Sequence, residues 1–291
     1  MTVLVPEIKL LAIDIDGTLL TPEKSISEKT RIAIHRAQAE GIIVTLATAR
    51  RYGNTKQYAD ELGISIPLIL CDGGLIIDHP DGTVLDTNLL PTEIARQAAE
   101  IMVSKRVQPV VQHIIGGVEE TWTGPIEFDN PGLEGYSRLI PHLRRMPYTT
   151  LWKGQPDPLR VVAFASKEAI ESIMAEIPRL PCWWNTIEEG NYGTAEVSVM
   201  NQTCSKANGV ARLAKSLSID LSQVMAIGDN TNDIEMLRAV GWGVAMGQAT
   251  DHVKACAQAV TTSNREDGVA VAIERYALRS ASKAASNSLN R

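Results

Sequence analysis

The sequence predicts an α/β protein with a Rossmann-like parallel-sheet core and an inserted α+β cap domain. Three observations support this prediction. Short apolar runs alternate with helical patterns over residues 1 to about 75, the same alternation returns from about Thr194, and the segment between mixes both element types with many Pro and Gly residues. Strand–helix–strand order is typical of parallel strands joined by right-handed crossovers. The two outer segments therefore form one sheet.

These outer segments carry six predicted strands and six predicted helices. Ser25 and Glu28 fit a capping box at the start of the first helix, and Gly41 fits its end. The predicted strands are residues 10–14, 42–48, 66–74, 222–229, 242–247 and 259–263, and the predicted helices are residues 25–41, 51–63, 205–219, 234–241, 249–258 and 267–278.

The middle segment follows a predicted hairpin at residues 75–87, whose turn is Pro80-Asp81-Gly82. The predicted core therefore comprises residues 1–86 and 189–277, and the predicted cap comprises residues 87–188. We expect the cap to act as a lid that selects the substrate. Residues 278–291 are polar without an apolar period, which predicts a disordered tail.

The composition narrows the class of protein. The chain has 291 residues and a net charge of −6, so no general attraction to nucleic acid or to anionic membranes is expected. Its four cysteines lack paired spacing, which fits a reducing compartment and predicts a cytoplasmic protein. Asp14 interrupts the apolar N-terminus, so neither a signal peptide nor a membrane span is expected. Both a monomer and a homodimer are compatible with the sequence.

Two aspartates, Asp14 and Asp16, end the first predicted strand. Residues two apart in an extended segment point to the same side, so the two carboxylates share a face, and Gly17 permits a tight turn after them. Neighbouring carboxylates repel unless a cation or a shared proton intervenes, and such oxygen ligands suit Mg²⁺. For this motif alone, a solvated Asp-x-Asp-Gly turn is the alternative.

The segment GDNTND, residues 228–233, has the same form after another apolar strand. Asp229 and Asp233 are four residues apart, so a helix beginning near Thr231 would bring them together. An aspartate cap on that helix explains the motif alone equally well. Together with DIDGT, the motif indicates a shared metal.

Thr48 and Lys206 complete the candidate set. A threonine hydroxyl at a strand end can bind a phosphate oxygen, although such a residue also fits a simple turn. Lys206 opens a predicted helix, where the helix dipole disfavours a cation unless an anion faces it; the alternative is a solvated lysine. Ligands of parallel sheets bind outside the carboxyl ends of the strands, so we expect these groups to converge there.

The motifs DIDGT, TLATAR around Thr48, SKANGV around Lys206 and GDNTND resemble, in this order, those of the haloacid dehalogenase-like phosphatase superfamily. The resemblance is to the Cof-like branch, which carries an α/β cap of type IIB. It covers nearly all of residues 8–86 and 190–277, and the cap matches by position and length only. It implies a Mg²⁺-dependent phosphatase that hydrolyses a small phosphorylated metabolite, such as a sugar phosphate, a nucleotide or a cofactor phosphate, through an aspartyl-phosphate.

The resemblance also implies residue roles. Asp14 would be the nucleophile, and Asp16 the general acid and base. Asp16 would reach the metal through its backbone carbonyl, and Asp233 would support the metal's waters or Lys206. The implied metal-binding residues are Asp14, Asp16, Asp229 and Asp233, and the implied phosphate-binding residues are Thr48, Lys206 and Asn232.

Three positions depart from the family pattern: Ala49 and Ala207 replace common glycines, and Asp72 replaces a common asparagine. Asp72 would add negative charge near the phosphate. Two alternatives to a phosphatase stay open. A phosphomutase or phosphotransferase would use the same chemistry, and a phosphate-ligand sensor would have lost activity, although the complete acidic set argues against a sensor.

Overall fold

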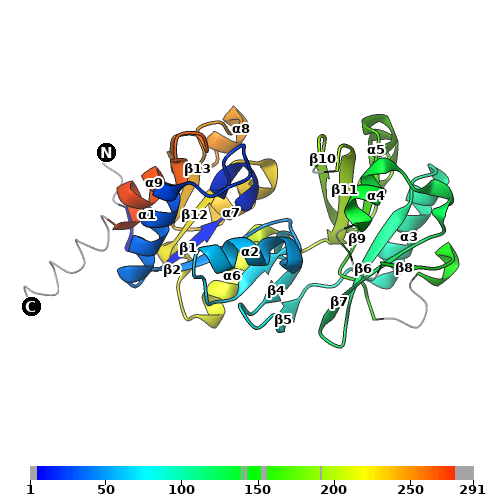
Figure 1. Cartoon of the computed structure of the whole chain (residues 1–291), viewed down its shortest axis with the longest axis horizontal. Coiled ribbons are helices and arrows are strands. Elements are labelled where there is room, and N and C mark those ends of the chain that lie inside the picture. Colours follow the sequence, from blue (N-terminus) through cyan, green and yellow to red (C-terminus); the bar gives the residue numbers. More distant parts are fainter. Residues whose placement is uncertain (1–4, 139, 141–142, 152–155, 191, 279–291) are drawn as a thin grey trace, which may run out of the picture. The chain divides into compact units, whose positions relative to one another are not determined.

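The computed structural model describes residues 5–138, 140, 143–151, 156–190 and 192–278 (Figure 1). The described residues fall into two compact units. Unit 1 lies within Met1–Asp86 and Ser205–Arg291, and unit 2 lies within Thr87–Cys204. Apart from Leu278, the tail predicted to be disordered lies outside the described residues. None of the helices in the described ranges combines the length and the apolarity needed to span a bilayer.

Unit 1 is built on a parallel sheet. Its described strands run in the order β14, β13, β12, β1, β2. The bounds are β1 (Leu10–Ile13), β2 (Ile43–Leu46), β12 (Val224–Gly228), β13 (Trp242–Ala245) and β14 (Ala259–Val260). β1 lies beside β12 although about two hundred residues separate them, so both outer segments of the chain contribute to one sheet (Figure 1). The predicted α/β fold class is confirmed.

Helices cover this sheet. Leu10 and Ala12 of β1 form a buried cluster with Val210 and Leu213 of α6 and with Leu237 of α7. Because side chains alternate along a strand, Leu11 and Ile13 point to the other face, and both are fully buried. The described α-helices of unit 1 are α1 (Glu28–Ala39), α2 (Tyr52–Glu61), α6 (Lys206–Ser216), α7 (Ile234–Ala239), α8 (Asp251–Lys254) and α9 (Gly268–Ala272).

The third predicted strand contacts the parallel sheet through a single β-bridge. β3 (Leu68–Leu70) joins β2 through one parallel bridge between Ala47 and Ile69. It pairs in antiparallel fashion with β4 (Leu75–Ile77), which is followed by β5 (Val84–Thr87) in the same small sheet. A tight turn at Cys71–Gly73 joins β3 to β4.

The predicted capping box of the first helix is wrong by two residues. α1 begins at Glu28, so its N-cap is Ser27, whose hydroxyl accepts a hydrogen bond from the Thr30 N–H at 3.2 Å. The Ser25 hydroxyl instead lies 3.2 Å from that of Thr21. Both serines suit an N-cap, and the chain's entry into the helix decides between them.

Unit 2 contains a six-stranded sheet of described strands in the order β10, β11, β9, β6, β7, β8. α3 (Thr92–Ser104) and α5 (Lys167–Met174) pack into one buried cluster with it, and α4 (Pro131–Ser137) into another. Trp122 belongs to the first cluster and is buried. The strands are β6 (Pro109–Ile115), β7 (Val118–Thr123), β8 (Leu143–Arg145), β9 (Arg160–Ala165), β10 (Cys182–Ile187) and β11 (Ala195–Asn201).

The second boundary between the units lies later than predicted. Residues 189–204, which the sequence assigned to the core, contain β11, and β11 pairs in antiparallel fashion with β9 and β10. Ala195, Val197 and Val199 of β11 are buried in the same cluster as α3 and α5. The pattern AEVSVMN predicts a strand in either sheet, because alternation does not reveal the neighbouring strand.

α6 approaches the Cys71–Gly73 turn so closely that it has no room for a side chain at Gly209. A Cβ atom there would lie 2.4 Å from Ile69 Cγ2 and 3.0 Å from Gly73 Cα. The exposed Gly53 in α2 has no such neighbour within 4 Å. We therefore expect Gly209→Ala to destabilise the protein by about 1–3 kcal/mol through overpacking. Gly53→Ala should be neutral or stabilising, up to about 1 kcal/mol, because alanine favours helix.

Urea unfolding of the two variants would measure these opposite effects. A Gly209→Ala variant as stable as the wild type would show that α6 does not pack this closely against the turn.

Candidate functional site

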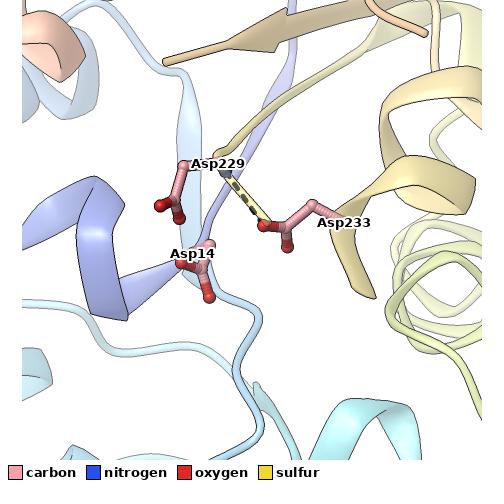
Figure 2. Close-up of side chains that lie close together, drawn as sticks. All are labelled: Asp14, Asp229 and Asp233. Carbon is pink, nitrogen blue, oxygen red and sulfur yellow. Dashed lines mark hydrogen bonds between the residues drawn. The ribbon is translucent and has the colours of Figure 1, made fainter. Parts of the chain in front are cut away.

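Three of the predicted carboxylates meet at the carboxyl-terminal edge of the parallel sheet. Asp14 directly follows β1, and Asp229 directly follows β12. The strands are parallel and pair Ile13 with Ile227, so the residues that follow them reach the same edge. One carboxylate oxygen from each of Asp14, Asp229 and Asp233 lies within 4.8 Å of the others (Figure 2).

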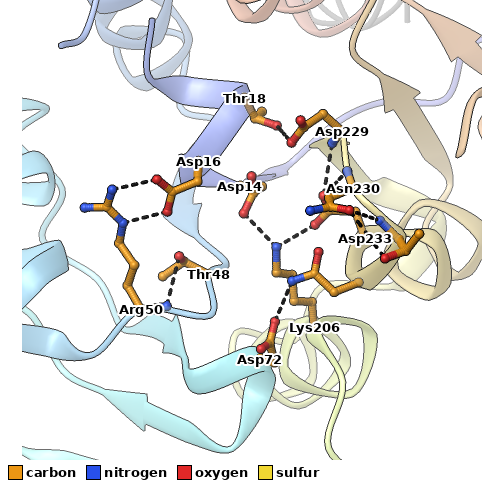
Figure 3. A network of polar contacts seen from close by, with 12 residues as sticks. Asp14, Asp16, Thr18, Thr48, Arg50, Asp72, Lys206, Asp229, Asn230 and Asp233 are labelled. Atoms are coloured by element: carbon orange, nitrogen blue, oxygen red, sulfur yellow. Dashed lines mark hydrogen bonds and ion pairs between the residues drawn. The ribbon is translucent and has the colours of Figure 1, made fainter. Parts of the chain in front are cut away.

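Lys206 is buried between two of these carboxylates. Its Nζ atom donates to Asp14 Oδ1 and to Asp233 Oδ1, both at 2.6 Å (Figure 3), and 1% of its side chain is exposed. Burial lowers the pKa of Lys206, but the charges of Asp14 and Asp233 outweigh it and raise the pKa, so the amine is charged. Lys206 is the first residue of α6, where the two carboxylates offset the unfavourable helix dipole.

Negative charge exceeds positive charge in this cluster. Burial raises the pKa of Asp14 well above its usual value, Asp233 and Asp229 add to this, and Lys206 opposes it. Burial and then the Asp233 charge raise the pKa of Asp229 to about 6, against the hydrogen bond from Thr18 and the Lys206 charge. With all groups ionised, three carboxylates face one ammonium group. A cation bound by hard oxygen ligands would relieve their repulsion.

Asp233 has both carboxylate oxygens engaged. Oδ1 accepts from Lys206, and Oδ2 accepts from the backbone N–H groups of Asp229 and Asn230, both at 3.0 Å. Asn230 caps the turn Thr231–Asp233, and Asp233 completes a capping box with it. The N-cap of this turn is therefore Asn230 rather than an aspartate, and Asp233 takes part in the capping only as the partner within the box. The same Asp233 carboxylate also belongs to the charged cluster.

The backbone leaves space around the Asp229 carboxylate. Gly17 has a positive φ of 80°, and a Cβ atom there would lie 2.3 Å from Asp229 Oδ2. The neighbouring Thr18 hydroxyl donates to Asp229 Oδ1 at 3.1 Å. Gln248 Nε2 donates to the Gly17 carbonyl oxygen at 2.6 Å. Only glycine fits this turn while the carboxylate stays at the strand end.

Asp16 lies apart from the cluster of Asp14, Asp229 and Asp233. Arg50 donates to both of its oxygens, from Nε to Oδ2 and from Nη2 to Oδ1, each at 2.7 Å (Figure 3). Burial raises the pKa of Asp16, but the hydrogen bonds and charge of Arg50 outweigh it and hold the pKa below its usual value. The predicted contribution of Asp16 to a metal, through its backbone carbonyl, stays a prediction.

Thr48 and Asn232 join the same polar network. Thr48 is buried, and its hydroxyl accepts a hydrogen bond from the Arg50 N–H at 3.2 Å, which leaves the hydroxyl proton for another acceptor. Asn232 Nδ2 donates at 2.8 Å to Oδ1 of Asp72, which is fully buried with a positive φ of 49°. Asp72 also contributes to the raised pKa of Lys206. The negative charge expected at this departure from the family pattern therefore lies beside the cluster.

Sequence reasoning missed three residues that the structure places in this network: Arg50, Thr18 and Gln248. Thr18 lies inside the DIDGT motif, and Arg50 follows Thr48 by two residues, so both carried a signal. Gln248 carried none of its own, because its role depends on a contact with Gly17.

Comparisons with known proteins show the family of this chain. A sequence profile described as haloacid dehalogenase-like hydrolase matches residues 11–273. A 5-amino-6-(5-phospho-D-ribitylamino)uracil phosphatase of Bacillus subtilis is 30% identical over 272 residues, which cover 94% of this chain and 97% of that relative. A pyridoxal phosphate phosphatase of Escherichia coli is 26% identical over 272 residues, which cover 90% and 96%.

Among solved structures, a sugar phosphatase of haloacid dehalogenase subclass IIB is similar with a TM-score of 0.75 and 25% sequence identity. The match covers 92% of this chain and 98% of that structure. The predictions of this superfamily and of a phosphatase are confirmed. The chain belongs to the haloacid dehalogenase-like hydrolases.

Proposed function

We propose that the chain is a Mg²⁺-dependent phosphatase that hydrolyses a small phosphorylated metabolite through an aspartyl-phosphate on Asp14. The observation that carries this proposal is the buried array in which Lys206 bridges Asp14 and Asp233 beside Asp229. Such an array holds a carboxylate nucleophile next to positive charge. A phosphate dianion repels a carboxylate, and the positive charge reduces this repulsion so that the nucleophile can approach phosphorus.

The first half-reaction transfers the phosphoryl group to Asp14. A carboxylate oxygen of Asp14 attacks phosphorus, the new O–P bond forms, and the bond from phosphorus to the leaving oxygen breaks. Asp16 gives its proton to the leaving oxygen, so that an alcohol departs. Lys206, Thr48 and Asn232 neutralise or hydrogen-bond the oxygens of the transferring group.

The second half-reaction releases phosphate. The ionised Asp16 takes a proton from water while the water oxygen attacks phosphorus, and the bond between phosphorus and Asp14 breaks. Asp16 then holds the proton that it lost in the first step, and Asp14 is again a carboxylate. The pairing of Asp16 with Arg50 supports this step, because it favours the ionised carboxylate that accepts a proton.

The residues around Asp229 fit a divalent cation. Asp14 and Asp229 would hold it with the Asp16 backbone carbonyl, and Gly17 leaves room beside Asp229. Asp233 would act mainly through Lys206, because both of its oxygens are already engaged. When bound, Mg²⁺ supplies positive charge that neutralises the transferring phosphoryl group.

The relatives support a small phosphorylated metabolite as the substrate. Their names describe phosphatases of a ribitylaminouracil phosphate, of pyridoxal phosphate and of sugars. These leaving groups differ in ring type and charge, so the similarity supports the reaction class and the size of substrate rather than one compound. Unit 2 is the candidate for selecting among them, as the cap prediction expects.

Replacement of Asp14 tests the nucleophile. Asp14→Asn should lower turnover of p-nitrophenyl phosphate by about 1,000-fold or more, because the amide cannot form the covalent intermediate. Asp81→Asn, in the exposed turn between β4 and β5, is the matched control and should leave turnover unchanged. A fully active Asp14→Asn enzyme would exclude this mechanism.

Removal of the metal tests the cation site. Chelation with EDTA should abolish turnover, and added Mg²⁺ should restore it. Mg²⁺ should also raise the thermal midpoint of the wild type, because a ligand that binds only the folded state stabilises it. Asp229→Asn should weaken this effect and require about tenfold more Mg²⁺, whereas Asp81→Asn should behave like the wild type. An identical midpoint shift in Asp229→Asn would exclude Asp229 as a ligand.

A further inference from the structure

Asp16 extends its carboxylate from a turn rather than from a strand or a regular helix. It belongs to the turn Ile15–Leu19, in which Asp16 has extended dihedral angles (φ −79°, ψ 119°) and Gly17 has a positive φ. Its side chain is 39% exposed, in contrast to the buried Asp14. A partly exposed carboxylate on a turn has several open rotamers, so its orientation depends on the side chains that contact it.

Arg50 fixes the orientation of the Asp16 carboxylate through two hydrogen bonds, which form a two-point contact. Its Nε and Nη2 atoms each donate to a different oxygen of Asp16 at 2.7 Å, which fixes the plane of the carboxylate as well as its distance. Lys24 also approaches Asp16, but with one contact of 3.6 Å from a side chain that is 58% exposed. A lysine contributes charge without fixing a plane.

The guanidinium is itself held in place. Its Nη1 atom donates to the Asn54 carbonyl oxygen at 3.2 Å, and its centre lies 5.3 Å from the centroid of the Tyr58 ring. The Arg50 backbone N–H donates to the Thr48 hydroxyl, so the residue is tied to the end of the second strand as well as to α2. Arg50 is 16% exposed. It therefore links the end of the second strand and α2 to the Asp16 carboxylate.

We propose that Arg50 is a positioning residue that holds the Asp16 carboxyl group where it can protonate the leaving oxygen. This inference rests on the proposed function, because it assumes that Asp16 is the general acid. Arg50 would act through Asp16 rather than on the phosphoryl group, so loss of its two-point contact should matter most for substrates whose leaving oxygen needs a proton. Its positive charge also favours the ionised form of Asp16, which opposes the acid step. Arg50→Lys keeps that charge and therefore tests the two-point contact alone.

Two artificial substrates of almost the same shape separate these effects. p-Nitrophenolate departs readily without a proton, whereas the phenolate released from phenyl phosphate is as basic as a tyrosine side chain, with a pKa of about 10. The value of kcat/KM reports the steps up to formation of the aspartyl-phosphate, which include departure of this group. We expect Arg50→Ala to lower kcat/KM at least tenfold more for phenyl phosphate than for p-nitrophenyl phosphate, as Asp16→Asn should do more strongly.

Three further variants distinguish positioning from charge and from folding. Lys24→Ala removes one positive charge beside Asp16 but keeps the two-point contact. Its kcat/KM should therefore change by the same factor for both substrates. Arg50→Lys keeps the charge and should still show the selective loss on phenyl phosphate, which covers the case in which Arg50→Ala does not fold. The double variant of Arg50→Ala with Asp16→Asn should be no slower on phenyl phosphate than Asp16→Asn alone.

Equal losses of kcat/KM on both substrates in Arg50→Lys would overturn the inference, whatever Arg50→Ala shows. Losses that multiply in the double variant would overturn it as well. Either result would mean that Arg50 acts on the phosphoryl group or only on stability. By contrast, an Asp16→Asn enzyme without selective loss would contradict the acid role of Asp16 itself. An inactive Asp14→Asn enzyme beside an unselective Arg50→Ala enzyme would leave the phosphatase standing.

Discussion

The buried ammonium group of Lys206 is the constraint on which the rest of the site depends. A charge with 1% of its side chain exposed is stable only when it is paired and hydrogen-bonded, and loss of one partner from such a pair costs about 3–5 kcal/mol. Asp14 and Asp233 are those partners. The end of β1, the start of α6 and the turn before α7 therefore stabilise one another through this ammonium group.

Glycine residues allow the segments that carry these charged groups to pack closely. Gly209 lets α6 contact the turn after β3, and Gly228 leaves space for the Asp233 side chain, whose Cγ would lie 2.5 Å from a Cβ atom at that position. Gly17 does the same for Asp229. Each glycine removes a side chain where a charged group or a backbone segment has to pass. The positions of the charges are thus set by packing as much as by electrostatics.

Structure and chemistry share side chains in this site. Asp233 accepts two backbone N–H groups as part of a cap and, through its other oxygen, pairs with Lys206. Thr48 ends a strand region and accepts the backbone N–H of Arg50, whose guanidinium holds Asp16. A change in one of these residues therefore alters local folding and the charged cluster together.

The sequence by itself determined the elements and the chemical types. Alternating apolar runs predicted the parallel sheet, and the four motifs predicted which residues follow its strands, because strand ends and helix starts have local signals. Only the tertiary structure decided which strands and side chains lie next to one another. It assigned β11 to the sheet of unit 2, moved the first helix cap to Ser27, and paired Arg50 with Asp16. These outcomes depend on contacts between segments far apart in the chain or on the path of the backbone, and a local pattern carries neither.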